Sequence, residues 1–112
     1  MSRDNEILLD LFNACRSIAD FTAGMEKDEF LKDTKTQSSV LYQIIIIGEA
    51  VNRLSESFKR SHPEIPYAQI KGMRNRVTHE YKDVDLDIVW DAINTDIPIL
   101  LDAIASSLTD TD

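Results

Sequence analysis

The stretch TQSSVLYQIIIIGEAVNRLSESFKR, residues 36–60, decides the fold of this chain. Its apolar residues recur at alternating steps of four and three, at Val40, Ile44, Ile47, Val51, Leu54 and Phe58. This spacing places an apolar stripe along a helix and is typical of the seam of a helix bundle. Ile45 and Ile46 widen the stripe, so we expect more than one neighbouring helix. Gly48 costs a helix interior about 1 kcal/mol relative to alanine, which indicates close packing against another helix.

Helical spacing continues on both sides of this stretch. The predicted helices cover about residues 3–21, 36–60, 66–81 and 83–108, and a short helical turn covers residues 27–31. Pro63 and Pro66 separate the second helix from the third, and Pro98 is expected to kink the last one because it lacks an N–H. No segment alternates as a strand does. The sequence predicts an all-α fold, an up-down bundle of four main helices with an additional short helical turn, in a single domain over residues 1–112.

The net charge of −8 is unevenly distributed. Residues 83–112 carry eight Asp and no Lys or Arg, so the twelve Lys and Arg and the other twelve acids all lie in residues 1–82. Within residues 71–82 the balance is reversed, because four basic residues face only Glu80; they are Lys71, Arg74, Arg76 and Lys82. An acidic chain with such a patch is able to bind RNA, although weakly and with strong salt dependence.

The sequence gives no sign of a disulfide or of a membrane segment. Cys15 is the single cysteine and falls on the apolar side of the first predicted helix, where a buried, unreactive thiol is expected. The N-terminal residues contain no apolar signal-peptide segment, and the run Ile44–Ile47 is far too short to span a bilayer. These features predict a soluble, cytoplasmic protein with no membrane partner.

The segment GMRNRVTHEY, residues 72–81, is the most specific part of the sequence. Arg74-Asn75 followed by His79 resembles the signature of the HEPN family, and Tyr81 after His79 resembles its narrower HepT branch. The flanks IGEA at 47–50, LSE at 54–56, VDLDIVW at 84–90 and DIP at 96–98 resemble HepT proteins as well, so the likeness covers essentially the whole chain. Thr78 and Glu80 depart from the usual residues, and Glu80 places a negative charge beside His79.

The resemblance implies a fold, an activity and a set of partners. It implies a HEPN-like helical homodimer that cleaves RNA as the toxin of a toxin–antitoxin pair, without a metal or any other cofactor. It implies that Arg74, His79 and Asn75 form the catalytic motif. It further implies that Tyr81 accepts AMP from a cognate MntA-like nucleotidyltransferase antitoxin, which adds negative charge where the RNA phosphate must lie.

The residue types fit this chemistry when taken by themselves. The histidine side chain titrates near neutral pH and suits proton transfer to or from ribose and phosphate oxygens. Arginine presents a bidentate fork to phosphate oxygens whose charge grows in the transition state, and Asn75 is suited to orient either group or a phosphate. Lys71, Arg76 and Lys82 are predicted to contact the RNA backbone; Arg76 has a structural role as its alternative.

Helical geometry restricts how this motif is assembled. On an ideal helix, five positions separate Arg74 and His79 by roughly 140° around the axis. Two possibilities remain: either the helix distorts before His79, or the working site is assembled across two chains of a two-fold dimer.

Less specific interpretations remain beside the enzymatic one. His79 also fits a capping or surface role, and Tyr81 also fits a ring that covers a helix end. The chain is then a non-catalytic binding module, the substrate-presenting partner of a nucleotidyltransferase, or merely a structural bundle. The acidic run at 83–87 lacks the glycine and glutamate of a calcium loop, so Asp83 or Asp85 is interpreted as a helix cap.

Overall fold

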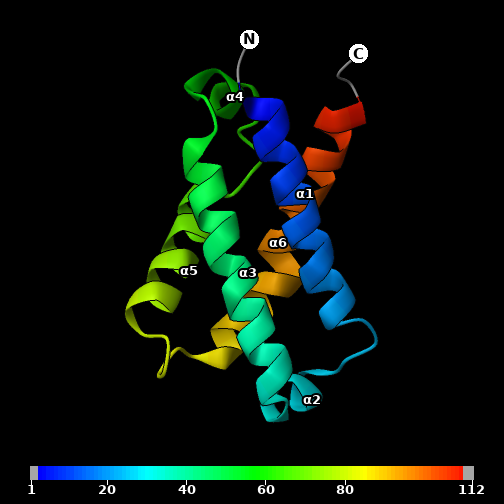
Figure 1. Cartoon of the computed structure of the whole chain (residues 1–112), viewed down its shortest axis with the longest axis vertical. Helices are drawn as coiled ribbons and strands as arrows, with labels where there is room; N and C mark the ends of the chain where they lie inside the picture. The colour runs from blue at the N-terminus through cyan, green and yellow to red at the C-terminus, as the bar shows by residue number, and fades with distance from the viewer. Residues whose placement is uncertain (1–2, 110–112) are drawn as a thin grey trace.

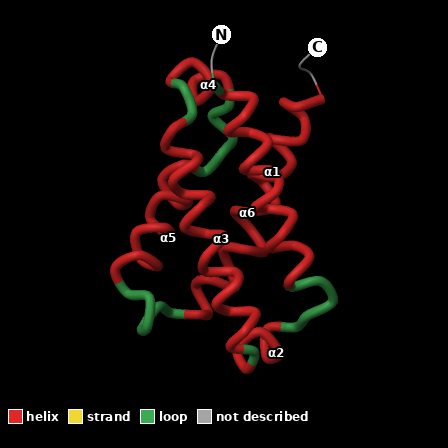
Figure 2. Tube along the Cα trace, in the orientation of Figure 1, coloured by secondary structure: helices red, strands yellow, loops and turns green. Residues whose placement is uncertain are grey.

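The computed structural model describes residues 3–109, and in that range it contains helices and no strand. The helices are α1 (Asp4–Phe21), α2 (Lys27–Lys32), α3 (Thr34–Arg53), α4 (Glu56–Ser61), α5 (Tyr67–His79) and α6 (Leu86–Thr109). The long helices α1, α3, α5 and α6 run side by side, with α4 at one end of the bundle and α2 at the other (Figure 1). Loops are short (Figure 2). The predicted all-α bundle of four main helices is confirmed.

Helix α3 is the centre of this arrangement. It packs against α1 on one side and α5 on the other, while α6 packs mainly against α1. Its predicted seam is buried from Val40 to Val51, and Ile45 and Ile46 are partly buried against the same core. The expectation that α3 meets more than one neighbour is confirmed, because an apolar surface wider than one stripe is covered by two helices.

The second long helix is shorter than the apolar spacing predicts, and its predicted end near Arg60 is wrong. α3 stops at Arg53, and the backbone is extended at Leu54 (ψ 146°) and Ser55 (ψ 154°). The carboxylate of Asp4 accepts hydrogen bonds from the backbone N–H of Ser55 (3.0 Å) and from its hydroxyl (2.6 Å). The Ser55 oxygen in turn accepts from the N–H of Phe58 (3.0 Å) and begins α4 as its N-cap.

The last two long helices begin and end close to the predicted positions. α5 ends at His79, and the side chain of Asp85 accepts a hydrogen bond from the N–H of Asp87 (2.9 Å) at the start of α6. Of the two caps predicted for this helix, Asp83 and Asp85, the structure shows Asp85. α6 continues through Pro98 to Thr109, and the kink at Pro98 stays a prediction.

Two expectations from the sequence concern Cys15 and membrane-spanning segments. Cys15 is buried in α1, which confirms its predicted place in the core, and burial raises the pKa of its thiol to about 12, which disfavours the reactive thiolate. Among the helices of residues 3–109, none combines the length and the apolar character needed to cross a membrane.

The link between Asp4 and Ser55 generates a stability prediction. Replacement of Ser55 by alanine removes the side-chain N-cap of α4 and the hydroxyl that donates to Asp4, while the backbone N–H of residue 55 still donates, so the free energy of unfolding should fall by about 1–2 kcal/mol. Urea denaturation followed by circular dichroism measures this change. Ser57→Ala, an exposed change in the same helix, is the matched control and should alter stability by less than about 0.5 kcal/mol. Equal effects of the two substitutions would contradict the role given to Ser55.

Candidate active site

Helix α5 carries most of the residues that the sequence singled out, and it is attached to the bundle by a narrow apolar edge. Only Ile70 and Val77 of this helix are buried. The basic residues Lys71 and Arg76 and the terminal His79 are exposed, whereas Arg74 and Asn75 are half-buried. The position of α5 therefore depends strongly on how closely it approaches α3.

Gly48 of α3 is the point of closest approach. A Cβ atom built on Gly48 would fall on the Cβ and Cγ atoms of Arg74, far inside van der Waals contact. The stem of Arg74 thus lies directly against the backbone of α3, and only glycine leaves room for it. The close helix contact predicted at Gly48 is confirmed, and its partner is the arginine of the motif.

The guanidinium group of Arg74 is held from two sides. Its Nη1 donates to the Oδ1 of Asn75 (3.0 Å), and its Nη2 lies 3.4 Å from the Oε2 of Glu49. Its Nε is buried and has no hydrogen-bond partner among the residues that the structure describes. A guanidinium has five N–H donors. The side chain keeps 34% of its surface exposed, so donors remain available to an incoming anion.

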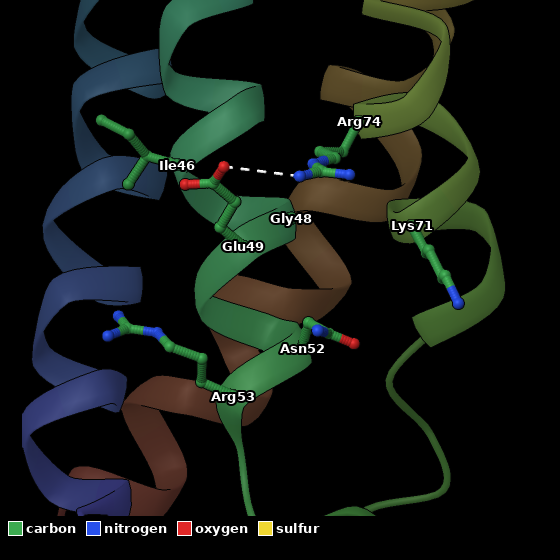
Figure 3. Close-up of a pocket in the computed structure, with 7 residues that line it drawn as sticks. All are labelled: Ile46, Gly48, Glu49, Asn52, Arg53, Lys71 and Arg74. Atoms are coloured by element: carbon green, nitrogen blue, oxygen red, sulfur yellow. Dashed lines mark hydrogen bonds and ion pairs between the residues drawn. The ribbon is translucent and has the colours of Figure 1, made fainter. Parts of the chain in front are cut away.

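Arg74 lies at the wall of a groove of about 540 Å³ between α3 and α5 (Figure 3). The groove is lined by Ile46, Gly48, Glu49, Asn52 and Arg53 of α3 and by Lys71 and Arg74 of α5. It brings Arg74 together with Lys71, which the sequence analysis had named, and adds Glu49, Asn52 and Arg53, which it had missed. The lining contains three basic side chains and one carboxylate, so the groove favours an anionic ligand.

His79 lies apart from this groove. It is the last residue of α5, its imidazole is exposed, and it makes no hydrogen bond or ion pair within residues 3–109. α5 is regular α-helix up to His79, so the distortion that would bring His79 and Arg74 to one face is absent. Five positions correspond to about 7.5 Å along an ideal helix and roughly 140° around it, which leaves the two side chains on different faces.

The remaining predicted residues line two other hollows. Arg76 lies between α5 and α6 in a hollow of about 420 Å³ that also contains Asp91 and Asp96, and burial raises the pKa of Asp96. Tyr81 and Lys82 follow α5 and line a hollow of about 250 Å³ against the start of α3. The Tyr81 side chain is 45% exposed. The structure thus brings Arg74 and Lys71 together in the groove, with Asn75 bound to the Arg74 guanidinium, and keeps Arg76, His79, Tyr81 and Lys82 outside it.

No metal site emerges from the residue types present. Within the described part of the chain, no group of three or more His, Cys, Asp or Glu side chains is arranged to hold a metal ion. The polar groups that line the groove are the guanidinium groups of Arg53 and Arg74, the ammonium group of Lys71, the amide of Asn52 and the carboxylate of Glu49.

The contact at Gly48 predicts that alanine changes the free energy of unfolding in opposite directions at Gly48 and at Gly72. Alanine normally stabilises a helix relative to glycine, yet Gly48→Ala should lower the free energy of unfolding by about 1–3 kcal/mol because its methyl group displaces α5. Gly72→Ala on α5 is the matched control: a Cβ there meets nothing within 4 Å. It should raise the free energy of unfolding by up to about 1 kcal/mol. Urea denaturation of both variants decides the point, and a stabilised Gly48→Ala protein would refute the close contact.

Comparison with known proteins places this chain among ribonucleases. The family model described as "Ribonuclease HepT-like" matches residues 11–106. The chain is 39% identical over 95 residues, 85% of its length and 86% of the relative's, to a protein of Thermococcus cleftensis named "Probable ribonuclease HepT". It is 37% identical over 91 residues, 81% of its length and 75% of the relative's, to a protein of Methanocaldococcus jannaschii named "Putative RNase MJ0127". No solved structure gives a significant match. This chain therefore belongs to the HepT-like ribonuclease family.

Proposed function

We propose that this HepT-like ribonuclease is a metal-independent endoribonuclease whose working site joins Arg74 and Asn75 of one chain to His79 of a second copy. The observation that supports this proposal is the way in which the guanidinium group of Arg74 is held. Its guanidinium is fixed by Gly48, Glu49 and Asn75 at the wall of an accessible basic groove, with N–H donors left for a phosphate.

The proposed reaction is transesterification of the RNA backbone. The imidazole of His79 takes the proton of a ribose 2′-hydroxyl while O2′ forms a bond to the adjacent phosphorus. The bond from phosphorus to the 5′ oxygen breaks, and that oxygen takes up a proton as it leaves. Arg74 donates to the non-bridging oxygens, whose negative charge grows in the transition state, and Asn75 holds the guanidinium through the hydrogen bond at Nη1.

A homodimer supplies the geometry that one chain lacks. Within a regular α5 the arginine and the histidine diverge, and a two-fold axis beside this helix would set Arg74 of one protomer against His79 of the other. Apolar surface next to the groove supports such an axis. Tyr42 is 61% exposed on α3, and Ile45 and Ile46 are only partly buried. A second copy of the chain would cover this strip.

Tyr81 is the proposed point of control. Its phenol is accessible, lies two positions after His79 and forms no hydrogen bond within residues 3–109. We place this chain as the toxin of a cytoplasmic toxin–antitoxin pair in which a nucleotidyltransferase antitoxin modifies this group. The phenolic oxygen would form a bond to the α-phosphorus of ATP, and pyrophosphate would leave. The resulting AMP group adds negative charge and bulk near His79, which would repel the RNA phosphate.

The first test is cleavage of RNA by the purified chain and its variants. Arg74→Ala and His79→Ala should each lower the cleavage rate at least about 100-fold, because each removes an interaction made in the transition state. Arg60→Ala, an exposed substitution on α4, is the control and should keep the parental rate. Cleavage should persist in EDTA, since neither residue acts through a metal ion. Parental rates in both site variants would overturn the catalytic assignment and favour a non-catalytic binding module.

A mixing experiment tests whether the site is shared between chains. Arg74→Ala and His79→Ala chains that are unfolded together and refolded form mixed dimers in which one composite site is intact. About a quarter of the parental activity should return, because about half of the dimers are mixed and each has one site of two. Each variant refolded alone should stay inactive. A mixture without activity would show that both groups act from the same chain.

The role of Tyr81 is tested by mass spectrometry. Chain co-expressed with a nucleotidyltransferase encoded beside it should gain an AMP group and lose ribonuclease activity. Tyr81→Phe should cleave RNA at the parental rate, gain no AMP and escape inhibition. Tyr42→Phe removes another exposed phenol and is the matched control, which should still be modified. Modification of the Tyr81→Phe chain would assign the acceptor elsewhere.

A further inference from the structure

We infer that the groove between α3 and α5 is a track for the RNA backbone, in which Arg53, Lys71 and Lys59 bind phosphates that flank the bond being cut. This inference rests on the proposed ribonuclease function and extends it from the reacting phosphate to its neighbours. It assigns a binding role to Arg53 and Lys59, which lie outside the HEPN-like motif.

The groove continues beyond the hollow that contains Arg74. A second hollow of about 220 Å³ shares Gly48, Asn52 and Lys71 with the first and adds Lys59 of α4. The two hollows therefore adjoin, and the combined surface extends from Arg74 past Lys71 to Lys59. It is built where α4 and α5 pass the C-terminal part of α3.

The basic residues of this surface are largely unneutralised. Arg53 and Lys71 are exposed, and neither side chain forms a hydrogen bond or ion pair within the described range 3–109. Lys59 makes only long contacts, 3.8 Å to Glu56 and 3.5 Å to the carbonyl of Asn52. In a chain of net charge −8, such a concentration of free cations is a local exception that suits a polyanion.

The directions of the side chains indicate that the groove binds several phosphates of a polymer and not one isolated phosphate. Arg53 extends to one side of α3 while Lys71 lies across the groove on α5, and Arg74 is at the end where Glu49 lies (Figure 3). Groups that point apart are not able to converge on one phosphate. They are able to contact successive phosphates of a strand that crosses the groove. Among the described residues, Glu49 is the only carboxylate that lines either hollow, so the charged lining residues beyond Arg74 are basic.

Binding of uncleavable RNA tests the track. The probe is a mixed-sequence 2′-O-methyl oligonucleotide, which lacks the attacking hydroxyl, and its Kd is measured by fluorescence anisotropy over a range of salt concentrations. The double variant Arg53→Gln, Lys71→Gln should bind about tenfold more weakly. Its slope of log affinity against log salt should be shallower by about 1.4, because two phosphate contacts to a single strand are lost. Lys59→Gln should reduce the slope by about 0.7.

The control is the double variant Arg16→Gln, Arg60→Gln. It removes the same charge from exposed positions on α1 and α4 that line neither hollow, and its Kd and slope should stay near the parental values. Circular dichroism and sedimentation are measured on every variant. Equal slopes for the groove and control variants would overturn the track. A groove variant that instead changes the oligomeric state would also overturn it, because the face would then be a contact between copies.

Cleavage kinetics separate this inference from the proposed function. With a long RNA the groove variants should raise KM about tenfold and leave kcat within about twofold, whereas a dinucleotide substrate, which is too short to cross the groove, should show no difference. If the parental chain cuts no RNA, the proposed function fails while the binding result still decides the track. If the parental chain cuts and the groove variants lose as much on the dinucleotide as on long RNA, the track fails and the proposed function stands.

Discussion

The approach of α5 to α3 at Gly48 is the contact on which the site depends. Helix α5 buries Ile70 and Val77 and packs mainly against α3, so the contact at Gly48 lies within its principal interface. At Gly48 the stem of Arg74 replaces a missing side chain and lies against the α3 backbone. The same contact brings the guanidinium to Glu49 and forms one wall of the basic groove. Gly48 and Arg74 therefore contribute both to the packing of α5 on α3 and to the wall of the groove.

The fold was largely predictable because the apolar spacing of each long helix is local information. The stripe from Val40 to Val51 and the cap at Asp85 are read from neighbouring residues, and both occur as expected. The end of α3 was not predictable in this way. Leu54 is buried and Phe58 packs against the core, so the apolar spacing continues across the break. The group that captures Ser55 is Asp4, 51 residues away, and no local pattern reveals it.

The sequence supplied the candidate residues of the site, whereas their surroundings became visible only in the structure. Arg74, Asn75 and His79 were singled out because their segment and its flanks resemble the HepT pattern. The distribution of the α5 side chains among separate hollows depends instead on which neighbouring helix covers each face of α5. Arg76 lines the α5–α6 hollow together with Asp91 and Asp96 and not the groove of Arg74. Glu49 and Asn52 follow Gly48 by one and four positions, a spacing that places polar groups beside a close helix contact. That spacing was the signal for the groove residues that sequence reasoning overlooked.

The separation of charge along the chain has a consequence for how the molecule meets its substrate. Six of the eight acids of the last thirty residues lie within residues 83–109, in α6 and the turn before it, whereas the basic side chains of the groove lie where α3, α4 and α5 meet. A small body with opposite signs on different sides carries a large electric dipole. In the field of a polyanion the protein rotates as it diffuses. The polyanion repels the acidic side at α6 and attracts the basic groove, so encounters with the groove facing the polyanion are favoured.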